Sequence, residues 1–269
     1  MIHYLTVHFH STDWIDTQLI QVRRHSNDDV QVWASLDGIA RDYASSFDHV
    51  YQFAGEHPDK LNALADEVSA VAEPDDILVF IDGDAFPVDD VRRSLRKAFE
   101  RHPLVGVQRL ESLGDCQPHP CFTATTVGFW NDAALDWSRG GRPWINNVGY
   151  LRFDAGARIL VRLEELGVSW LPLLRSNKRD LHPVLFGIYG DLVYHHGSSF
   201  RRATTQVDRY QTGMLENPGG LRSVPRLLAT RRRENKNAAI SRKLFTAIRE
   251  DPDVVKRIFL DDAADAFAI

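Results

Sequence analysis

The sequence predicts a doubly wound α/β fold, with a mixed central sheet flanked by helices. Apolar segments typical of strands alternate with amphipathic segments typical of helices from the first residues onward. The run Ile77-Leu78-Val79-Phe80-Ile81 is apolar without alternation, as in a strand covered on both faces. From about Thr204 the chain becomes polar and helix-prone. We therefore expect a sheet domain over residues 1–202 and a helical extension over 203–269.

The first third of the chain has the clearest signals for where helices and strands begin and end. Ser11, Thr12 or Asp13 can cap a helix directly after the β-prone start of the chain. Further on, Leu61, Leu64, Ala65 and Val68 recur at the spacing of one helical face, and the Pro-Asp-Asp segment at 74–76 ends that helix. The expected elements are strand 4–9, helix 14–25, strands 30–36 and 49–53, helix 59–71 and strand 77–81.

The rest of the sheet domain is interrupted by loops. A charged amphipathic helix is expected over 88–102, and a Gly/Pro/His loop separates β-rich runs at 104–110 and 121–130. A loop with two tryptophans follows over 137–148. The remaining expectations are a helix over 154–166 and extended segments over 168–174, 185–189 and 192–196.

Composition restricts the class of protein. With 43% hydrophobic and 26% charged residues in 269, the chain resembles ordinary globular proteins. No apolar stretch approaches the roughly 18 residues of a membrane span, and the run Ile2–Phe9 does not fit a signal peptide. Cys116 and Cys121 lack zinc-site spacing and are interpreted as reduced thiols. These features predict a cytoplasmic protein.

Two carboxylates follow the buried strand directly, in Asp82-Gly83-Asp84. Ligands of doubly wound sheets collect at the carboxyl ends of strands. Paired carboxylates offer the hard oxygen ligands that Mg²⁺ or Mn²⁺ needs, and a glycine lets the backbone approach a phosphate. The alternative is a solvated turn, which Asp-Gly pairs also form.

The segment Ile77 to Pro87 resembles the DxD segment of GT-A glycosyltransferases. The resemblance implies a metal-dependent enzyme that transfers a sugar from a nucleotide diphosphate donor, with a UDP-sugar favoured, to a hydroxyl acceptor. It implies that Asp84 ligates Mn²⁺ or Mg²⁺. It also implies that Asp82 contacts the metal through water or holds the donor ribose, with Gly83 beside the nucleotide.

Two later segments occur in the order that the resemblance requires. Phe153-Asp154-Ala155-Gly156 is similar to the segment that faces the donor sugar, although Asp154 could equally be a helix N-cap. Tyr194 to Arg201 resembles the loop that supplies a histidine ligand. His195 and His196 both depart from the usual His-x-x-Gly spacing, and we favour His196. Arg201 and Arg202 could hold the diphosphate.

Weaker expectations concern the nucleotide and the catalytic base. The resemblance places base and ribose near the end of the first strand, at His8, His10 and Thr12, and polar contacts at Lys60 and Asn62. An inverting enzyme needs a carboxylate base near the acceptor hydroxyl, for which Asp154 and Asp191 are candidates; a retaining enzyme needs none.

Other functions stay open at this point. A phosphohydrolase of the haloacid dehalogenase type also has a strand-end DxD, but nearer the N-terminus, and a nucleotidyltransferase generally needs a Gly-rich loop after its first strand. A non-catalytic carbohydrate-binding relative is the third alternative.

The basic residues between Arg222 and Lys243 lack the aromatic interleaving of nucleic-acid sites, so no nucleic-acid partner is predicted. They fit either a solvated helix pair or a peripheral contact with anionic lipid. Surface polysaccharide synthesis is the pathway we expect by analogy.

Overall fold

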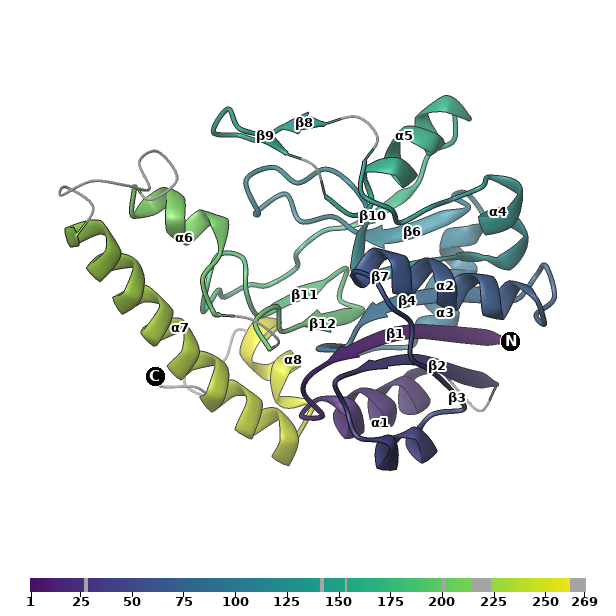
Figure 1. Ribbon diagram of the computed structural model, residues 1–269, viewed down its shortest axis with the longest axis horizontal. Coiled ribbons are helices and arrows are strands. Elements are labelled where there is room, and N and C mark those ends of the chain that lie inside the picture. Colours follow the sequence, from purple (N-terminus) through teal and green to yellow (C-terminus); the bar gives the residue numbers. More distant parts are fainter. Residues whose placement is uncertain (27–28, 141–142, 153, 200–201, 214–223, 262–269) are drawn as a thin grey trace.

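A seven-stranded mixed sheet forms the centre of the molecule (Figure 1). The computed structural model describes residues 1–26, 29–140, 143–152, 154–199, 202–213 and 224–261. One strand, β7, is antiparallel to both of its neighbours, and the other pairings are parallel. In spatial order the strands are β10 (Leu171–Leu173), β6 (Leu104–Val107), β7 (His119–Thr126), β4 (Ile77–Asp82), β1 (Ile2–Phe9), β2 (Val30–Asp37) and β3 (His49–Tyr51).

Helices cover both faces of this sheet, as the continuous apolar strands require. Two of them, α1 (Ile15–Ser26) and α3 (Val91–Phe99), pack with one face of the strands in a single core cluster. The other face packs against α2 (His57–Ser69), α4 (Val127–Asp132) and α5 (Ala157–Glu165). A short 3-10 helix, η1 at 41–46, connects β2 to β3.

A second, three-stranded sheet lies beside the first. Its order is β11 (Gly187–Tyr189), β12 (Val193–His195) and β5 (Ala85–Pro87), all antiparallel. Apolar side chains of this sheet share a third core cluster with those of two C-terminal helices. The helices of the C-terminal region are α6 (Gln206–Gln211), α7 (Val224–Glu250) and α8 (Val254–Phe259).

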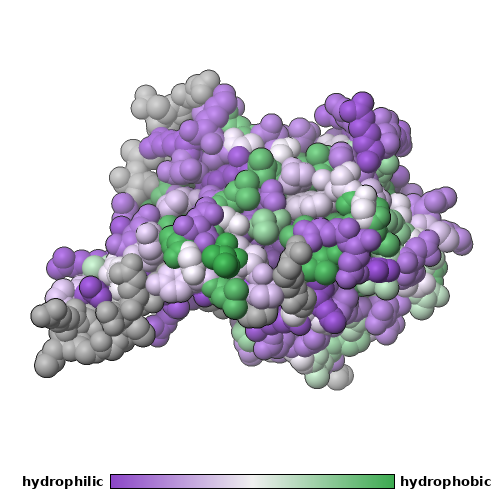
Figure 2. Space-filling model, turned by 90° about the horizontal axis from the view of Figure 1, so that it is seen from above, coloured by the Kyte–Doolittle hydropathy of each residue, from purple (hydrophilic) through white to green (hydrophobic). Residues whose placement is uncertain are grey.

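The remaining pieces lie at the periphery. The strands β8 (Trp144–Ile145) and β9 (Leu151–Arg152) form a small hairpin with exposed apolar side chains at Ile145 and Leu151. Seen from above, the molecule's surface is largely hydrophilic with limited apolar areas (Figure 2). Among the helices of the described residues, none is both long and apolar enough for a membrane span.

The expected mixed α/β fold with C-terminal helices is confirmed. One expected element was wrong in part, because the β-rich run over 121–130 is a strand only as far as Thr126. There the Thr126 hydroxyl accepts a hydrogen bond from the Phe129 backbone N–H and caps α4. Threonine therefore both ends the strand and begins the helix.

Strand register brings the ends of three parallel strands to one edge. Val7 pairs with Asp82 across β1 and β4, and Phe9 pairs with Asp37 across β1 and β2. The chain then passes from β4 into β5, which belongs to the second sheet. The acidic segment 82–84 thus lies at the junction of the two sheets, at the carboxyl edge where ligands of α/β proteins bind.

Candidate functional site

A cleft of about 510 Å³ opens at this junction. It is lined by the ends of β1, β2 and β4, the start of α2, the start of β7, the residues just before α5, and the end of β12 with the loop that follows it. The charged and imidazole side chains that line it are Asp37, Glu56, His57, Lys60, Asp82, Asp84, Arg109, His119, Arg139, Asp154 and His195.

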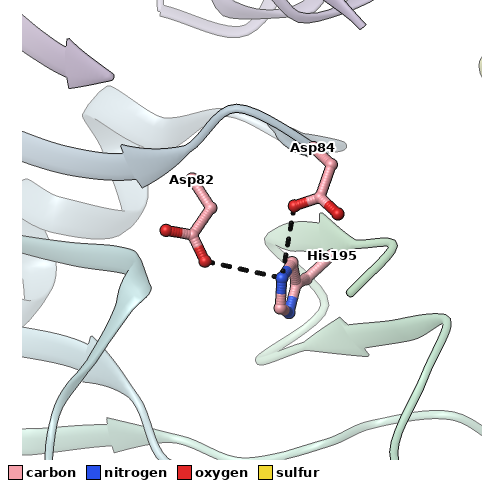
Figure 3. A group of neighbouring side chains, drawn as sticks. All are labelled: Asp82, Asp84 and His195. Carbon is pink, nitrogen blue, oxygen red and sulfur yellow. Dashed lines mark ion pairs between the residues drawn. The ribbon is translucent and has the colours of Figure 1, made fainter. Parts of the chain in front are cut away.

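Three of these residues form the acid–histidine cluster, which is Asp82, Asp84 and His195 (Figure 3). One potential ligand atom from each lies within 4.8 Å of the others. The His195 Nε2 atom is 3.5 Å from Asp82 Oδ2 and 3.4 Å from Asp84 Oδ1. Two carboxylates and an imidazole are a donor set that suits Mn²⁺ or Mg²⁺, so the residues present fit a divalent ion.

Asp84 is fixed in orientation by the loop after β12. Its carboxylate is 4% exposed, and its Oδ2 atom accepts hydrogen bonds from the backbone N–H groups of Gly197 and Ser199, at 3.0 and 3.3 Å. Burial raises the pKa of Asp84, but His195, His196 and the Ser199 hydrogen bond outweigh it and hold the pKa well below its usual range. The Oδ1 atom, which faces His195, is left for a ligand.

Asp82 has a second imidazole beside it. His57 Nε2 lies 3.3 Å from Asp82 Oδ1, while His195 lies on the other carboxylate oxygen. Burial raises the pKa of Asp82, but these two histidines together bring it below its usual value. The cluster therefore holds two ionised carboxylates close together, an arrangement that a bound cation stabilises.

Gly83 is required by close packing. A Cβ atom at this position would lie 2.7 Å from the Val7 backbone oxygen and 2.9 Å from His8 Nδ1. The acidic loop thus crosses directly over the end of β1, and any side chain would displace it.

The structure brings His195 to the acids, whereas the sequence favoured His196 as the third ligand. His196 is 1% exposed and points away from the acids, with Nδ1 2.9 Å from the Tyr194 hydroxyl and Nε2 2.7 Å from the Ser241 hydroxyl. Its ring packs on Trp14, with centroids 4.7 Å apart. Burial lowers the pKa of His196 to about 3, so it is neutral. Side chains alternate along a strand, which is why only His195 faces the cleft.

The residues expected to contact the nucleotide at the end of β1 are not among those that line the cleft. His8 is buried beneath Gly83 and hydrogen-bonds Gln18 at 3.1 Å, and burial lowers its pKa to about 4. His10 is exposed with φ of 52° and packs against the Phe9 ring outside the cleft lining. Thr12 lies before α1, and its carbonyl accepts from the Ile15 N–H. The β1 side chains in the cleft are instead Val7 and Phe9.

Lys60 and Asn62 have different places. Lys60 lines the cleft, is 4% exposed, forms an ion pair with Asp37 and lies 5.8 Å from the centroid of the Phe9 ring. Asn62 holds the segment after α4 instead, because its side chain bonds Asp136, Ser138 and the Trp137 backbone N–H. The expectation of a ligand contact from Asn62 therefore finds no support in its position.

The two candidate catalytic bases, Asp154 and Asp191, lie in different parts of the structure. Asp154 is exposed and lines the cleft, and its carboxylate accepts a hydrogen bond from the Ala155 N–H. Asp191 lies in the turn between β11 and β12, at the end of the hairpin opposite His195, with φ of 55°. It is not among the residues that line the cleft, so its position does not support the expected role as a base. Arg201 lies outside the described residues, and Arg202 is 88% exposed beside Glu234.

Several residues that line the cleft belong to no motif that the sequence analysis recognised. Phe9 and Asp37 are the last residues of two parallel strands, so the strand ends could have identified them. His57 and Arg109 had no such signal: one begins α2 and the other follows β6 by two positions. Only folding brings His57 and Arg109 into the same cleft as the two aspartates.

Comparisons with known proteins find likeness among solved structures. No family model and no curated protein sequence matches the chain. S. aureus TarS in complex with UDP-GlcNAc is 10% identical over 51% of this chain and 48% of that chain, with a TM-score of 0.39. Mouse xyloside xylosyltransferase 1 is 8% identical over 49% and 69%, with a TM-score of 0.35. The galactosyltransferase LgtC, solved with donor and acceptor sugar analogues, is 8% identical over 48% and 59%, also at 0.35. The chain spans about half the length of the TarS structure that it matches.

Proposed function

We propose that this protein is a metal-dependent glycosyltransferase of the GT-A type, which moves a sugar from a nucleotide diphosphate, with a UDP-sugar favoured, to a hydroxyl acceptor. The observation that carries the proposal is the acid–histidine cluster at the carboxyl end of β4, inside a cleft of about 510 Å³ that charged side chains also line. Mn²⁺ or Mg²⁺ held by Asp82, Asp84 and His195 would neutralise charge on the departing nucleotide diphosphate.

The nucleoside end of the donor is assigned to the ends of β1 and β2. The Phe9 ring is 44% exposed in the cleft and offers a flat apolar face to a base. Asp37 presents a carboxylate beside it, where ribose hydroxyls could donate hydrogen bonds. Lys60, held by Asp37, adds a positive charge that attracts a diphosphate.

The sugar end is assigned to Asp154, which lines the cleft just before α5. Its carboxylate can accept hydrogen bonds from sugar hydroxyls, or in an inverting reaction it can take the proton of the acceptor hydroxyl. Both roles require a carboxylate that a ligand in the cleft can reach, and the exposure of Asp154 supports this.

The location and pathway are part of the same proposal. We place the protein in the cytoplasm, with an acceptor from surface polysaccharide or glycoconjugate synthesis. The first turns of α7 extend away from the sheets (Figure 1) and expose Val224, Leu227 and Leu228. Arg231 and Arg232 follow and are exposed, a pattern that supports peripheral contact with anionic lipid.

Isothermal calorimetry tests the function directly. Wild-type protein is titrated with UDP, UDP-sugars and GDP-sugars, with Mn²⁺ and with EDTA. We expect at least one nucleotide sugar to bind only with the metal, and Asp84→Asn to lose that binding. Metal-independent binding, or phosphate release from simple phosphoesters without any nucleotide-sugar binding, would overturn the proposal in favour of a hydrolase.

A further inference from the structure

The β8–β9 hairpin has its apolar side chains on the outside. Ile145 and Leu151 face each other across the two strands and are 70% and 56% exposed. The opposite face carries the pair Trp144 and Arg152, which are half-buried. A two-stranded ribbon on a protein surface normally has the reverse pattern, with apolar side chains toward the protein and polar ones toward water. The outer face of this hairpin therefore suits surroundings less polar than water.

The polar groups that the hairpin buries support the same conclusion. Trp144 Nε1, Asn146 Nδ2 and Arg152 Nε are buried and have no hydrogen-bond partner among the described residues. Burying polar groups without partners is unfavourable. If only water met the outer face, a hairpin with the apolar pair inside and these polar groups outside would be more stable. The observed arrangement indicates an apolar partner that offsets this cost.

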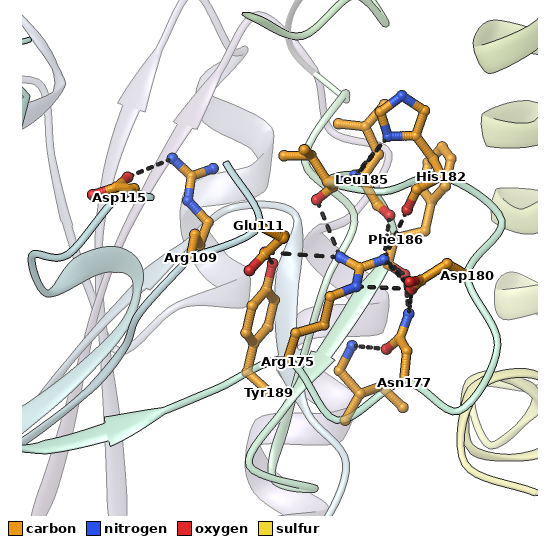
Figure 4. Close-up of polar contacts among 12 residues, drawn as sticks. Arg109, Glu111, Asp115, Arg175, Asn177, Asp180, His182, Leu185, Phe186 and Tyr189 are labelled. Carbon is orange, nitrogen blue, oxygen red and sulfur yellow. Dashed lines mark hydrogen bonds and ion pairs between the residues drawn. The ribbon is translucent and has the colours of Figure 1, made fainter. Parts of the chain in front are cut away.

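The turn after β6 holds the hairpin in this orientation. The Asn147 N–H donates a hydrogen bond to the Leu113 carbonyl at 2.9 Å, and a Cβ atom on Gly114 would lie 2.3 Å from Asn147 Oδ1. The turn is itself anchored to the second sheet, because Glu111 accepts a hydrogen bond from the Tyr189 hydroxyl at 2.7 Å (Figure 4). The apolar pair is thus presented on a fixed support.

The hairpin adjoins the cleft and is one of two apolar projections. Asp154, which lines the cleft, follows β9 by two positions. The other projection is the start of α7, where Val224, Leu227 and Leu228 are exposed. In Figure 1 the hairpin and the first turns of α7 both extend beyond the sheets, at the top and at the upper left. The view from above shows compact apolar areas among hydrophilic surroundings (Figure 2).

A lipid bilayer fits these projections better than a protein does. A stable protein interface buries about 800 Å² per partner, which two side chains of a short hairpin cannot supply. Membrane contact instead adds up from separate apolar side chains and the basic ones near them. Over residues 231–236 of α7 the exposed charged side chains are all basic, namely Arg231, Arg232, Arg233 and Lys236. This charge is complementary to an anionic headgroup surface.

We propose that the outer face of the β8–β9 hairpin, made by Ile145 and Leu151, inserts into the headgroup region of an anionic membrane beside the cleft. The inference rests on the lipid contact of α7 that is part of the proposed function, and it adds a second, separate surface. Two contacts orient the molecule as well as hold it, because a single contact leaves it free to turn about that point. In this orientation the side of the cleft that carries Asp154 lies next to the membrane.

Vesicle sedimentation measures the contact. Wild-type protein is mixed with vesicles of phosphatidylcholine alone, or of equal parts phosphatidylcholine and phosphatidylglycerol. We expect binding to the anionic vesicles that weakens with added NaCl. Ile145→Ser combined with Leu151→Ser should lower the partition coefficient at least roughly tenfold. Ile145→Trp should bind at least as tightly as the wild type, because indole rings favour the membrane interface.

A matched control replaces two equally exposed apolar side chains elsewhere. Ile20 and Val71 are 60% and 70% exposed, on α1 and just after α2. Ile20→Ser combined with Val71→Ser should leave the partition coefficient within about twofold. The Kd of UDP with Mn²⁺ should be the same in the wild type and in every variant, which shows that the fold and the cleft are intact.

The outcomes separate the hairpin from the rest of the proposal. Unchanged vesicle binding in the hairpin serine variant, or an equal loss in the control, overturns the hairpin contact while that of α7 stands. A dimer that light scattering detects without lipid, and that the hairpin serine variant loses, also overturns it, because a second copy then covers this face. A wild type that does not bind anionic vesicles overturns both lipid contacts. Nucleotide binding is measured separately, so the glycosyltransferase function is judged on its own result.

Discussion

The Gln18 side chain donates a hydrogen bond from Nε2 to the backbone carbonyl of Asp82, at 2.8 Å, across 64 positions of sequence. The same nitrogen donates to the Ala85 carbonyl at 2.7 Å, so it holds the acidic loop at both ends. The Oε1 atom accepts from Thr6 Oγ1 and faces His8 Nε2, each at 3.1 Å. Every polar atom of this buried amide is therefore used to position the loop.

Gln18→Met should weaken Mn²⁺ binding roughly 10- to 100-fold, because the supporting hydrogen bonds of a metal site orient its ligands. Methionine has similar length but cannot hold the two carbonyls. The matched control is Gln21→Met, one turn later on α1, where a buried glutamine does not contact the acidic loop and its Oε1 has no partner among the described residues. Mn²⁺ titration followed by electron paramagnetic resonance measures both. Equal losses in the two variants would mean that Gln18 acts only through general stability.

The two adjacent histidines should respond differently to alanine. His195→Ala removes a proposed ligand, and we expect the Mn²⁺ affinity to fall at least roughly tenfold. Its melting temperature should change less than that of His196→Ala. His196→Ala should leave the affinity within a few-fold but cost about 1–3 kcal/mol of stability, because Tyr194 and Ser241 lose their buried partner. Calorimetry and chemical denaturation of both variants check this. The opposite pattern would return the ligand role to His196.

Gly83→Ala should abolish metal binding although alanine is the smallest possible addition. The new methyl group would overlap the Val7 carbonyl and force the acidic loop away from β1. Gly149→Ala is a useful comparison, because it has φ of 84° but open space around the Cβ position. It should lose roughly 1 kcal/mol through backbone strain and keep its Mn²⁺ affinity. If Gly83→Ala binds Mn²⁺ normally, the acidic loop can shift to accept the methyl group, and close packing does not require glycine there.

Asp208 should make the protein sensitive to acid. It lies between His182 Nε2, 3.2 Å from both carboxylate oxygens, and the Thr205 N–H and hydroxyl, both 2.8 Å from Oδ2. Burial raises the pKa of Asp208, but the hydrogen bonds from His182 and Thr205 outweigh it and hold the pKa well below its usual value.

Because the folded-state pKa is depressed, the stabilisation is complete above the unfolded pKa of about 4 and is lost as the pH falls below it. The free energy of unfolding, measured by urea titration from pH 6 to pH 3, should therefore decrease over the acidic part of this range. Asp208→Asn should be less stable at pH 6 and show a flatter decrease. A decrease as steep as that of the wild type would show that other carboxylates are responsible.

The sequence alone predicts the part of the site in which a recognisable strand is followed directly by the functional residues. The strand at β4 was expected because its apolar run does not alternate, and Asp82 and Asp84 follow from being at its end. The choice between His195 and His196 required the register of β12 against β5, which depends on contacts more than 100 positions apart. The position of Asn62 could not be predicted for a similar reason, because a helix places successive polar residues on different faces and only packing decides which face meets the cleft.

The alternation at β12 has a consequence for how this protein can vary. One imidazole serves the cleft and the next is enclosed by Trp14, Phe186 and Ser241. A slip of β12 by one position against β5 would exchange the two, turning the enclosed ring toward the cleft and the other away from it. The pairing of β12 with β5, and not the order of residues alone, therefore decides which imidazole the cleft receives.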